Sequence, residues 1–214
     1  MMMNAYDKIY LESARKSLAR MCDYAVYDLK YDLEEFFDMF ITSSYAKRFE
    51  YGEATVVAGH SGVELAYDIL DENGKFSLHI EPQYTVNRSK EYWFGWALAY
   101  YQWYTGLSFA EIIKYVPVKK ILKLYSPYHE MDIRHFVNKM NELYLEEKKV
   151  TNLKIRRKKL GVSQSKLSEL TGIPVRTIQQ YEQRQKNINK AQAEYLVILA
   201  RVLYCRVEDL IEKV

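Results

Sequence analysis

The chain has 214 residues, enough for two ordinary domains or one large one. Hydrophobic residues make up 49% and charged residues 28%, which is typical of a folded protein and excludes a disordered chain. The net charge of +3 conceals an uneven distribution. Residues 151–214 hold 13 Lys+Arg against 6 Asp+Glu, a balance of +7, and residues 1–150 hold 18 against 22, a balance of −4. This division favours nucleic-acid binding at the C-terminal end and another role for the rest.

The cysteines and the most apolar stretch exclude several protein classes. Cys22 and Cys205 fall in different expected domains, so they form neither a disulfide framework nor a zinc site. Residues 1–7 lack the basic start and apolar run of a secretory signal. Tyr92–Leu107 is shorter than the roughly 20 residues that a membrane span needs. We therefore expect a cytoplasmic protein without a cofactor and without a membrane anchor.

Two segments carry residue types that are common in active sites, but neither has the required spacing. His129 and His135 lie six residues apart, whereas the zinc-protease helix places its histidines four apart. Gly59–Val63 resembles the turn that holds a nucleophilic serine, yet that turn needs glycine where Val63 stands. We therefore expect no bound metal and no enzymatic activity.

Apolar residues at steps of three and four predict a mainly helical N-terminal domain over residues 1–149. Ser108 and Glu111 have the spacing of a capping box. The acidic residues of Asp28–Asp38 are expected on the solvated side of a helix. Phe76–Val86 is predicted to be extended or a short hairpin. The expected helices, in chain order, are Ile9–Leu29, Leu33–Ile41, Val63–Leu70, Tyr92–Tyr104, Ser108–Val116, Val118–Tyr125 and Asp132–Lys149.

An aromatic cluster lies within the Tyr92–Tyr104 helix and holds all three tryptophans of the chain. Its members are Tyr92, Trp93, Trp96 and Trp103. Three interpretations stay open: packing in the core, a surface for a partner protein or a second copy, and a small-molecule pocket. Core packing is the simplest, because aromatic side chains bury large areas.

Residues 150–214 predict a series of short helices separated by well-defined turns. Thr151 or Asn152 can cap the first helix, for which Leu153, Ile155 and Leu160 supply apolar positions. Gly161 suits the left-handed residue that ends this helix. Ser163 can cap a second helix, Gln164–Leu170, which is expected to bury Leu167 and Leu170. Thr171–Ile173 predicts a tight turn.

The third helix of this segment is expected to begin near Pro174, whose missing N–H costs nothing at a helix start. It is predicted to run from Val175 to about Gln183, with Ile178 and Tyr181 facing inward. Arginine pairs with guanine and glutamine with adenine in the major groove of DNA. The polar residues left on or near the outer face are Arg176, Thr177, Gln179 and Gln180.

The segment Gly161–Glu182 and the apolar residues that follow it resemble the Cro/C1-type (XRE) helix-turn-helix family of bacterial and phage repressors. The resemblance covers about 60 residues and implies a five-helix, lambda-repressor-like DNA-binding domain. It implies that Gln164 holds a DNA phosphate at the start of the second helix, where Ser163 and Ser165 are also expected to contact DNA. It further implies that Val175, Arg176 and Gln180 face bases and that Thr177 contacts the backbone. Arg157 and Glu182 match an ion pair between the first and third helices.

One stretch departs from the family pattern. Many members have a short glycine-containing loop after the third helix, but Gln183–Lys190 is longer and has no glycine. The third helix is therefore expected to continue into it, and Arg184 and Lys186 are candidate phosphate contacts.

The function expected from the sequence is a sequence-specific regulator, a repressor that binds double-stranded DNA as a homodimer. The alternative is an antitoxin-type autoregulator, in which the acidic, Tyr/Trp-rich domain binds and neutralises a partner protein.

Overall fold

The computed structural model of the protein describes residues 4–75, 80–83, 88–148 and 150–212. Over these residues the fold is all-α, with helices, turns and no strand, as predicted. Most of Phe76–Val86, the predicted extended segment, lies outside the described residues, and residues 80–83 have no regular secondary structure. The chain divides into two compact units, Met1–Glu147 (unit 1) and Lys148–Val214 (unit 2).

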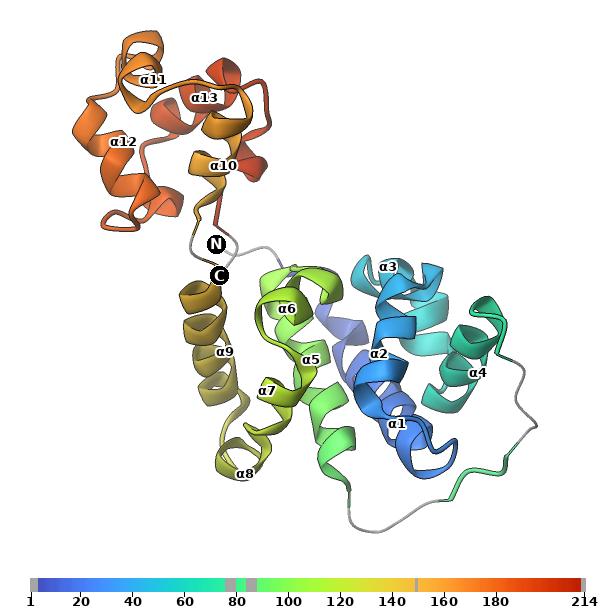
Figure 1. The fold of residues 1–214 in the computed structure, drawn as a ribbon. Coiled ribbons are helices and arrows are strands. Elements are labelled where there is room, and N and C mark those ends of the chain that lie inside the picture. The colour runs from blue at the N-terminus through green and yellow to red at the C-terminus, as the bar shows by residue number, and fades with distance from the viewer. Residues whose placement is uncertain (1–3, 76–79, 84–87, 149, 213–214) are drawn as a thin grey trace. The chain divides into compact units, whose positions relative to one another are not determined.

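Unit 1 contains nine of the α-helices in the described part of the chain (Figure 1). Two short helical segments, η1 (Lys8–Tyr10) and the π-helix η2 (Thr55–Gly59), accompany them. The helices are α1 (Leu11–Tyr27), α2 (Leu33–Thr42), α3 (Ser44–Glu50), α4 (Gly62–Glu72), α5 (Lys90–Thr105), α6 (Phe109–Tyr115), α7 (Val118–Leu122), α8 (Tyr125–Tyr128) and α9 (Ile133–Glu147).

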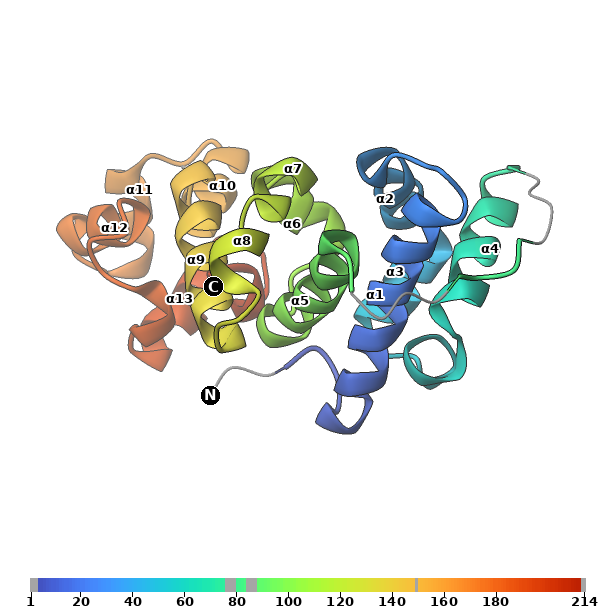
Figure 2. The same ribbon diagram turned by 90° about the horizontal axis from the view of Figure 1, so that it is seen from below.

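Helix α1 lies between α4 and α5, and Figure 2 shows it flanked by them. Both neighbours approach its backbone through a glycine. A Cβ added at Gly62 would lie 2.5 Å from the Met21 amide nitrogen, and one at Gly95 would lie 2.5 Å from the Leu18 carbonyl oxygen. Such distances are too short for any side chain, so these glycines permit the close packing of three helices.

The side chains on α2, α3, α5 and α6 form a phenylalanine core. Phe37 contacts Phe94 edge to face, with ring centroids 5.2 Å apart. Phe109 contacts Phe40 and Phe49 at 5.2 and 5.6 Å. All five rings are fully buried. Because each buried aromatic ring removes a large apolar area from water, this cluster supplies much of the hydrophobic stabilisation of unit 1.

The structure corrects three expectations for unit 1. The sequence reasoning missed α3, which Ser43 caps. The helix expected over Val118–Tyr125 is broken after Leu122, and a separate turn of helix, α8, follows. Asp28 was expected on a solvated helix face, but its side chain is only 3% exposed and pairs with Arg20. Of the three interpretations of the aromatic cluster, core packing applies to Trp103, which is buried and donates through Nε1 to the Tyr6 carbonyl at 2.8 Å.

Two serines clarify the capping signals. The serine half of the predicted box at Ser108 is present, since its side chain accepts from the Glu111 amide at 3.1 Å. The Glu111 carboxylate accepts a hydrogen bond from the Tyr144 hydroxyl. A complete capping box forms at Ser61 and Glu64, at the start of α4. Ser61, in the segment that resembled a nucleophile turn, is therefore a helix cap.

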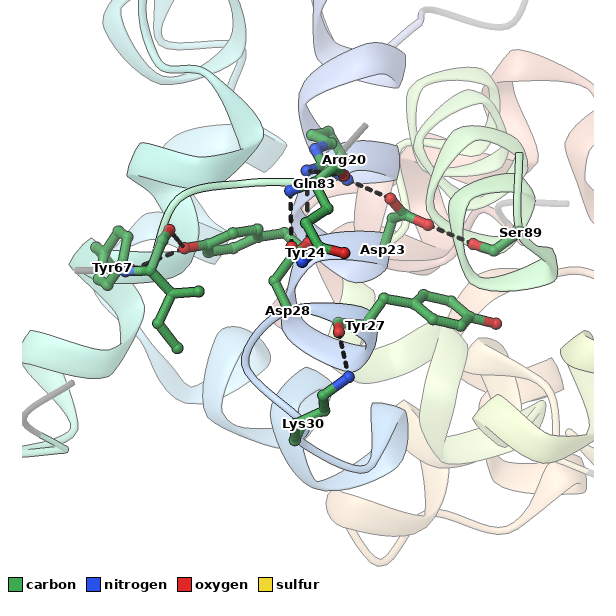
Figure 3. A network of polar contacts seen from close by, with 10 residues as sticks. Arg20, Asp23, Tyr24, Tyr27, Asp28, Lys30, Tyr67, Gln83 and Ser89 are labelled. Carbon is green, nitrogen blue, oxygen red and sulfur yellow. Dashed lines mark hydrogen bonds and ion pairs between the residues drawn. The ribbon is translucent and has the colours of Figure 1, made fainter. Parts of the chain in front are cut away.

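A polar network fastens residues 80–83 to α1 and α4 (Figure 3). The Ile80 amide donates to the Tyr67 hydroxyl at 2.7 Å, and the Tyr24 hydroxyl donates to the Ile80 carbonyl. Burial raises the pKa of the Tyr24 phenol, so this hydroxyl keeps the proton that it donates. The Gln83 amide donates to Asp28 at 2.8 Å, and Arg20 donates to the Gln83 carbonyl at 3.0 Å. Side chains thus supply the hydrogen-bond partners of the Ile80 and Gln83 backbone groups, which in a sheet a neighbouring strand would supply.

No helix in the described part of the chain combines the length and hydrophobicity that crossing a membrane needs. Within the same residues, no group of three or more His, Cys, Asp or Glu side chains is placed to hold a metal ion.

Candidate nucleic-acid interface

Unit 2 is built from four α-helices and two short 3-10 segments within its described residues. The fifth predicted helix is only the 3-10 turn η4. The other 3-10 segment, η3, follows the third α-helix. The elements are α10 (Asn152–Lys159), α11 (Gln164–Thr171), α12 (Val175–Glu182), η3 (Ile188–Lys190), α13 (Ala193–Val202) and η4 (Val207–Asp209).

The turns between the first three of these helices follow from local chemistry. Thr151 caps α10, and Ser163 caps α11 by accepting from the Lys166 amide at 3.0 Å. Gly161 and Gly172 end α10 and α11 with φ of +66° and +71°, a conformation that glycine adopts without a steric penalty. These turns set the direction in which α12 leaves α11.

A single apolar core holds the helices together. Leu153 of α10, Leu167 of α11 and Ile178 of α12 are at most 1% exposed, and Tyr181 is 7% exposed. The prediction that Ile155, Leu160 and Leu170 belong to the apolar face of their helices is wrong, because these side chains are 45%, 42% and 52% exposed. The helices are only eight residues long, so each presents one narrow buried stripe and leaves its other apolar residues outside.

A buried ion pair links the three helices. Arg157 of α10 donates from Nε and Nη2 to the two carboxylate oxygens of Glu182, at 2.6 and 3.0 Å. Its Nη1 donates to the Val162 carbonyl at 2.7 Å. Gln164, the first residue of α11, donates from Nε2 to Glu182 Oε2 at 2.7 Å. The hydrogen bond with Glu182 raises the pKa of Arg157 further above its usual value. Glu182 therefore fixes the end of α12 against both preceding helices.

One face of α12 points away from the core. Gln179 and Gln180 lie three and four residues after Arg176, so the three side chains share the side opposite Ile178 and Tyr181. Arg176 is exposed and forms no ion pair with another described residue, and the two glutamines are half-buried. Val175 and Thr177 border this face, with Val175 38% exposed. The structure thus brings together on one helix all five residues that the sequence assigned to DNA contacts there.

The N-terminus of α11 holds the other three predicted contacts. Ser163 and Ser165 are exposed, and Gln164 is half-buried with its amide oriented by Glu182. A primary amide carries two N–H groups, so Gln164 retains a second donor. The first N–H groups of an α-helix have no partner within the helix, which makes such an end suited to an anion.

The stretch after α12 differs from the prediction. The helix does not continue into Gln183–Lys190, because Gln183 ends it and Arg184 adopts φ of +57°. Arg184 thus takes the left-handed position that glycine often occupies. Its side chain is half-buried, with Nη2 3.7 Å from Glu212 Oε2. Lys186 is exposed and forms no ion pair with another described residue. Of the two predicted phosphate contacts, only Lys186 is freely presented to solvent.

Glu212 is a structural residue that the sequence reasoning missed. Its carboxylate accepts from the Asn152 amide at 2.6 Å, at the start of α10. It also faces Lys148 and Arg184, each at 3.7 Å. Asn189 bonds the Glu212 backbone from the loop after α12. In the sequence, Glu212 is only an acidic residue near the end of a basic segment. That position does not indicate which residues Glu212 contacts.

Residues 163–182 thus form a capped helix, a tight glycine turn and a second helix with a polar outer face. Residues 153–210 match the helix-turn-helix family model. These residues are a helix-turn-helix domain of the Cro/C1 type. No curated protein and no solved structure matches the chain.

The helix-turn-helix assignment supports a DNA-binding regulator of the XRE type. In this class of motif the second helix of the pair lies in the major groove and the first crosses the backbone. In the present domain these are α12 and α11. The family match covers 58 of the 214 residues and does not extend into unit 1.

Proposed function

We propose that the protein is a sequence-specific transcriptional repressor that binds double-stranded DNA as a homodimer. The observation that carries the proposal is the outer face of α12, where Arg176 has no ion-pair partner among the described residues and Gln180 stands one turn away. Arginine can donate two hydrogen bonds to guanine, and glutamine can bond adenine through both its donor and its acceptor. These two side chains are assigned to base reading.

We assign the contacts that position the protein on the DNA backbone to residues at the start of α11 and to residues on and after α12. Gln164 offers a side-chain N–H held in place by Glu182, and Ser163 and Ser165 add hydroxyls beside it. Thr177 and Lys186 extend the same contact to the neighbouring phosphates. Such contacts fix the register of the protein on DNA without reading sequence.

The homodimer is proposed because a single domain of this size would bury little surface on DNA. One small module buries only about 600–1,000 Å² of protein surface on DNA, less than a specific complex usually needs. Two copies related by a twofold axis would read a palindrome whose half-sites lie about 10 base pairs apart or a multiple of that distance.

Genome-wide mapping of the sites bound by the full chain tests this function. The expected result is a small set of sites that share a near-palindromic motif, with higher transcription of the adjacent genes when the protein is deleted. Enrichment without a common motif would contradict sequence-specific binding. Lower transcription after deletion would contradict repression.

The alternative proposal is an antitoxin-type autoregulator whose unit 1 binds a partner protein. It is favoured by large tyrosines on the surface of unit 1, where Tyr27 is 50% and Tyr51 83% exposed. Of the four aromatic residues first considered for such a surface, Trp93 and Trp103 are buried, and only Tyr92 and Trp96 are half-exposed. Purification from the native host discriminates: a stoichiometric partner supports the alternative, and recovery of the chain alone contradicts it.

A further inference from the structure

A pocket of about 240 Å³ opens at the N-terminal end of α5 in unit 1. Four aromatic rings form its walls: Tyr92, Trp93 and Trp96 from α5 and Tyr125 from α8. Arg88 and His129, both exposed, stand among the lining residues. Concave sites of this kind, with apolar walls and a few polar groups, are the usual form of small-molecule sites.

The aromatic walls are held in place by packing against one another and against neighbouring side chains. Trp93 contacts Tyr125 and Phe136 edge to face, with ring centroids 5.6 and 5.2 Å apart. Trp96 lies against the buried guanidinium of Arg15, whose carbon is 3.4 Å from the ring centroid. His129 stacks on Tyr125 with ring centroids 4.4 Å apart. A flat apolar ligand would therefore pack against the parts of these fixed rings that remain exposed, at little cost in side-chain entropy.

Hydrogen bonds hold the edge of the pocket in place. Ser89, another lining residue, caps α5 and donates from Oγ to Asp23 Oδ1 at 2.6 Å. Asp23 also pairs with Arg20, which continues the network of Figure 3. The site is thus preformed and needs no rearrangement of the helix start.

At the edge of the pocket, Arg88 favours negative charge. The Arg88 guanidinium carbon lies 4.6 Å from the Tyr92 ring centroid, and Arg88 forms no ion pair with another described residue. His129 Nδ1 lies 3.0 Å from the Tyr125 carbonyl oxygen, so its N–H is directed to the backbone. No carboxylate is among the lining residues, and Glu130, 3.6 Å from His129 Nε2, is 86% exposed. A cationic ligand would meet Arg88, whereas an anion would pair with it.

We propose that this pocket binds a small planar aromatic anion, such as an aryl carboxylate, with its ring between the tryptophan and tyrosine walls and its acidic group at Arg88. The site is distinct from the helix-turn-helix domain, and the inference does not depend on DNA binding. It gives unit 1 a ligand-binding role.

Three naphthalene probes test the proposal on the full chain. Naphthalene-2-carboxylate is the anion, naphthalene-2-carboxamide its neutral counterpart and 2-naphthylmethylammonium the cation. Binding is followed by isothermal calorimetry and by the fluorescence of the tryptophans. We expect saturable binding of the carboxylate, weaker binding of the amide and the weakest binding of the cation. Absence of saturable carboxylate binding, or equal affinity for all three probes, would overturn the proposal.

The variant Arg88→Gln tests whether the acidic group of the ligand lies at Arg88. Because it removes a charge-assisted contact, carboxylate affinity should fall about tenfold while amide affinity stays within about twofold. Arg134→Gln is the matched control, since it removes an exposed arginine of the same unit that does not line the pocket. Arg88 is exposed, so circular dichroism should show both variants folded. An unchanged carboxylate affinity in Arg88→Gln would assign binding to another place and contradict the proposal.

Discussion

Glu182 shows how one residue can serve both stability and recognition. Its side chain is 1% exposed and accepts hydrogen bonds from Arg157 and from Gln164. A buried carboxylate needs such partners, because an unpaired charge inside a protein is costly. The same contacts orient the Gln164 amide at the start of α11, where the proposed phosphate contact lies. Residues that never touch DNA can therefore decide the geometry of the interface.

Replacing Glu182 by glutamine should destabilise the helix-turn-helix domain by about 3–5 kcal/mol, because Arg157 would remain buried without its counter-charge. Urea unfolding followed by circular dichroism measures the loss. The control is Glu169→Gln, which removes an exposed pair with Lys166 at 2.9 Å and should cost less than about 1 kcal/mol. Equal effects of the two substitutions would show that the buried pair contributes no more than a surface pair.

At the scale of the elements, unit 1 depends on how closely α4 and α5 approach α1. Glycine is a poor helix former, costing about 1 kcal/mol relative to alanine in a helix interior. Gly95 is nevertheless in the middle of α5, where no Cβ would fit against the Leu18 carbonyl. The packing of helix backbones compensates for the loss of helix propensity.

Gly95→Ala should therefore destabilise unit 1 by about 1–3 kcal/mol or more, since two backbones must separate to accept the methyl group. The midpoint of thermal unfolding checks this. Gly59→Ala is a suitable control, because its added methyl group would meet its nearest neighbour at an ordinary 3.7 Å. If Gly95→Ala were as stable as Gly59→Ala, the close approach of α5 to α1 would be wrong.

The elements also show what a sequence can predict. Local signals were reliable: Ser163 caps α11, and Gly161 and Gly172 adopt the left-handed conformation. The exposure of apolar residues within the short helices could not be predicted in the same way. Ile155 and Leu170 are apolar, yet their side chains lie outside the small core. Contacts between residues distant in sequence left no local signal. The ties of Glu212 to Asn152 and of Gln83 to Asp28 are of this kind.

The end of α12 illustrates a subtler limit. The absence of glycine in Gln183–Lys190 favoured a longer helix, since glycine is the usual residue at a left-handed helix end. Arg184 takes that conformation at φ +57°, with its side chain directed at Glu212. A left-handed residue costs roughly 1–2 kcal/mol, and here it lets the Lys186 amide donate to the Gln180 carbonyl at 3.1 Å, which closes the end of the helix. Local propensity alone could not have indicated this.

At the scale of the whole molecule, each unit has its own core and one cysteine. Cys22 is fully buried in unit 1, and burial raises the pKa of its thiol. Cys205 packs against the core of unit 2, and burial raises its thiol pKa as well. Both effects slow alkylation of the folded protein, because the thiolate is the reactive form. The two cysteines are therefore separate reporters for the opening of the two units.

We expect Gly95→Ala to accelerate the labelling of Cys22 by iodoacetamide and to leave Cys205 unchanged, and Glu182→Gln to do the reverse. Under conditions of rapid opening and closing, each 1.4 kcal/mol of lost stability should raise the rate by about tenfold. Mass spectrometry of peptide fragments gives both rates in one sample. Acceleration of both sites by either variant would mean that the units open together.

The central claim is that Arg176 and Gln180 on α12 read the DNA sequence. The most direct measurement is the ratio of affinities for the mapped site and for a scrambled duplex, by fluorescence anisotropy at fixed salt. Each base contact contributes about 1–3 kcal/mol of discrimination, so Arg176→Ala/Gln180→Ala should lower the ratio by at least about thirtyfold. Weak, salt-sensitive binding should persist.

The matched control is Arg201→Ala/Gln192→Ala, which removes the same two residue types from exposed positions at either end of α13. Its affinity ratio should equal that of the wild type. A wild-type ratio in the α12 double variant would contradict the assignment of this face to sequence reading.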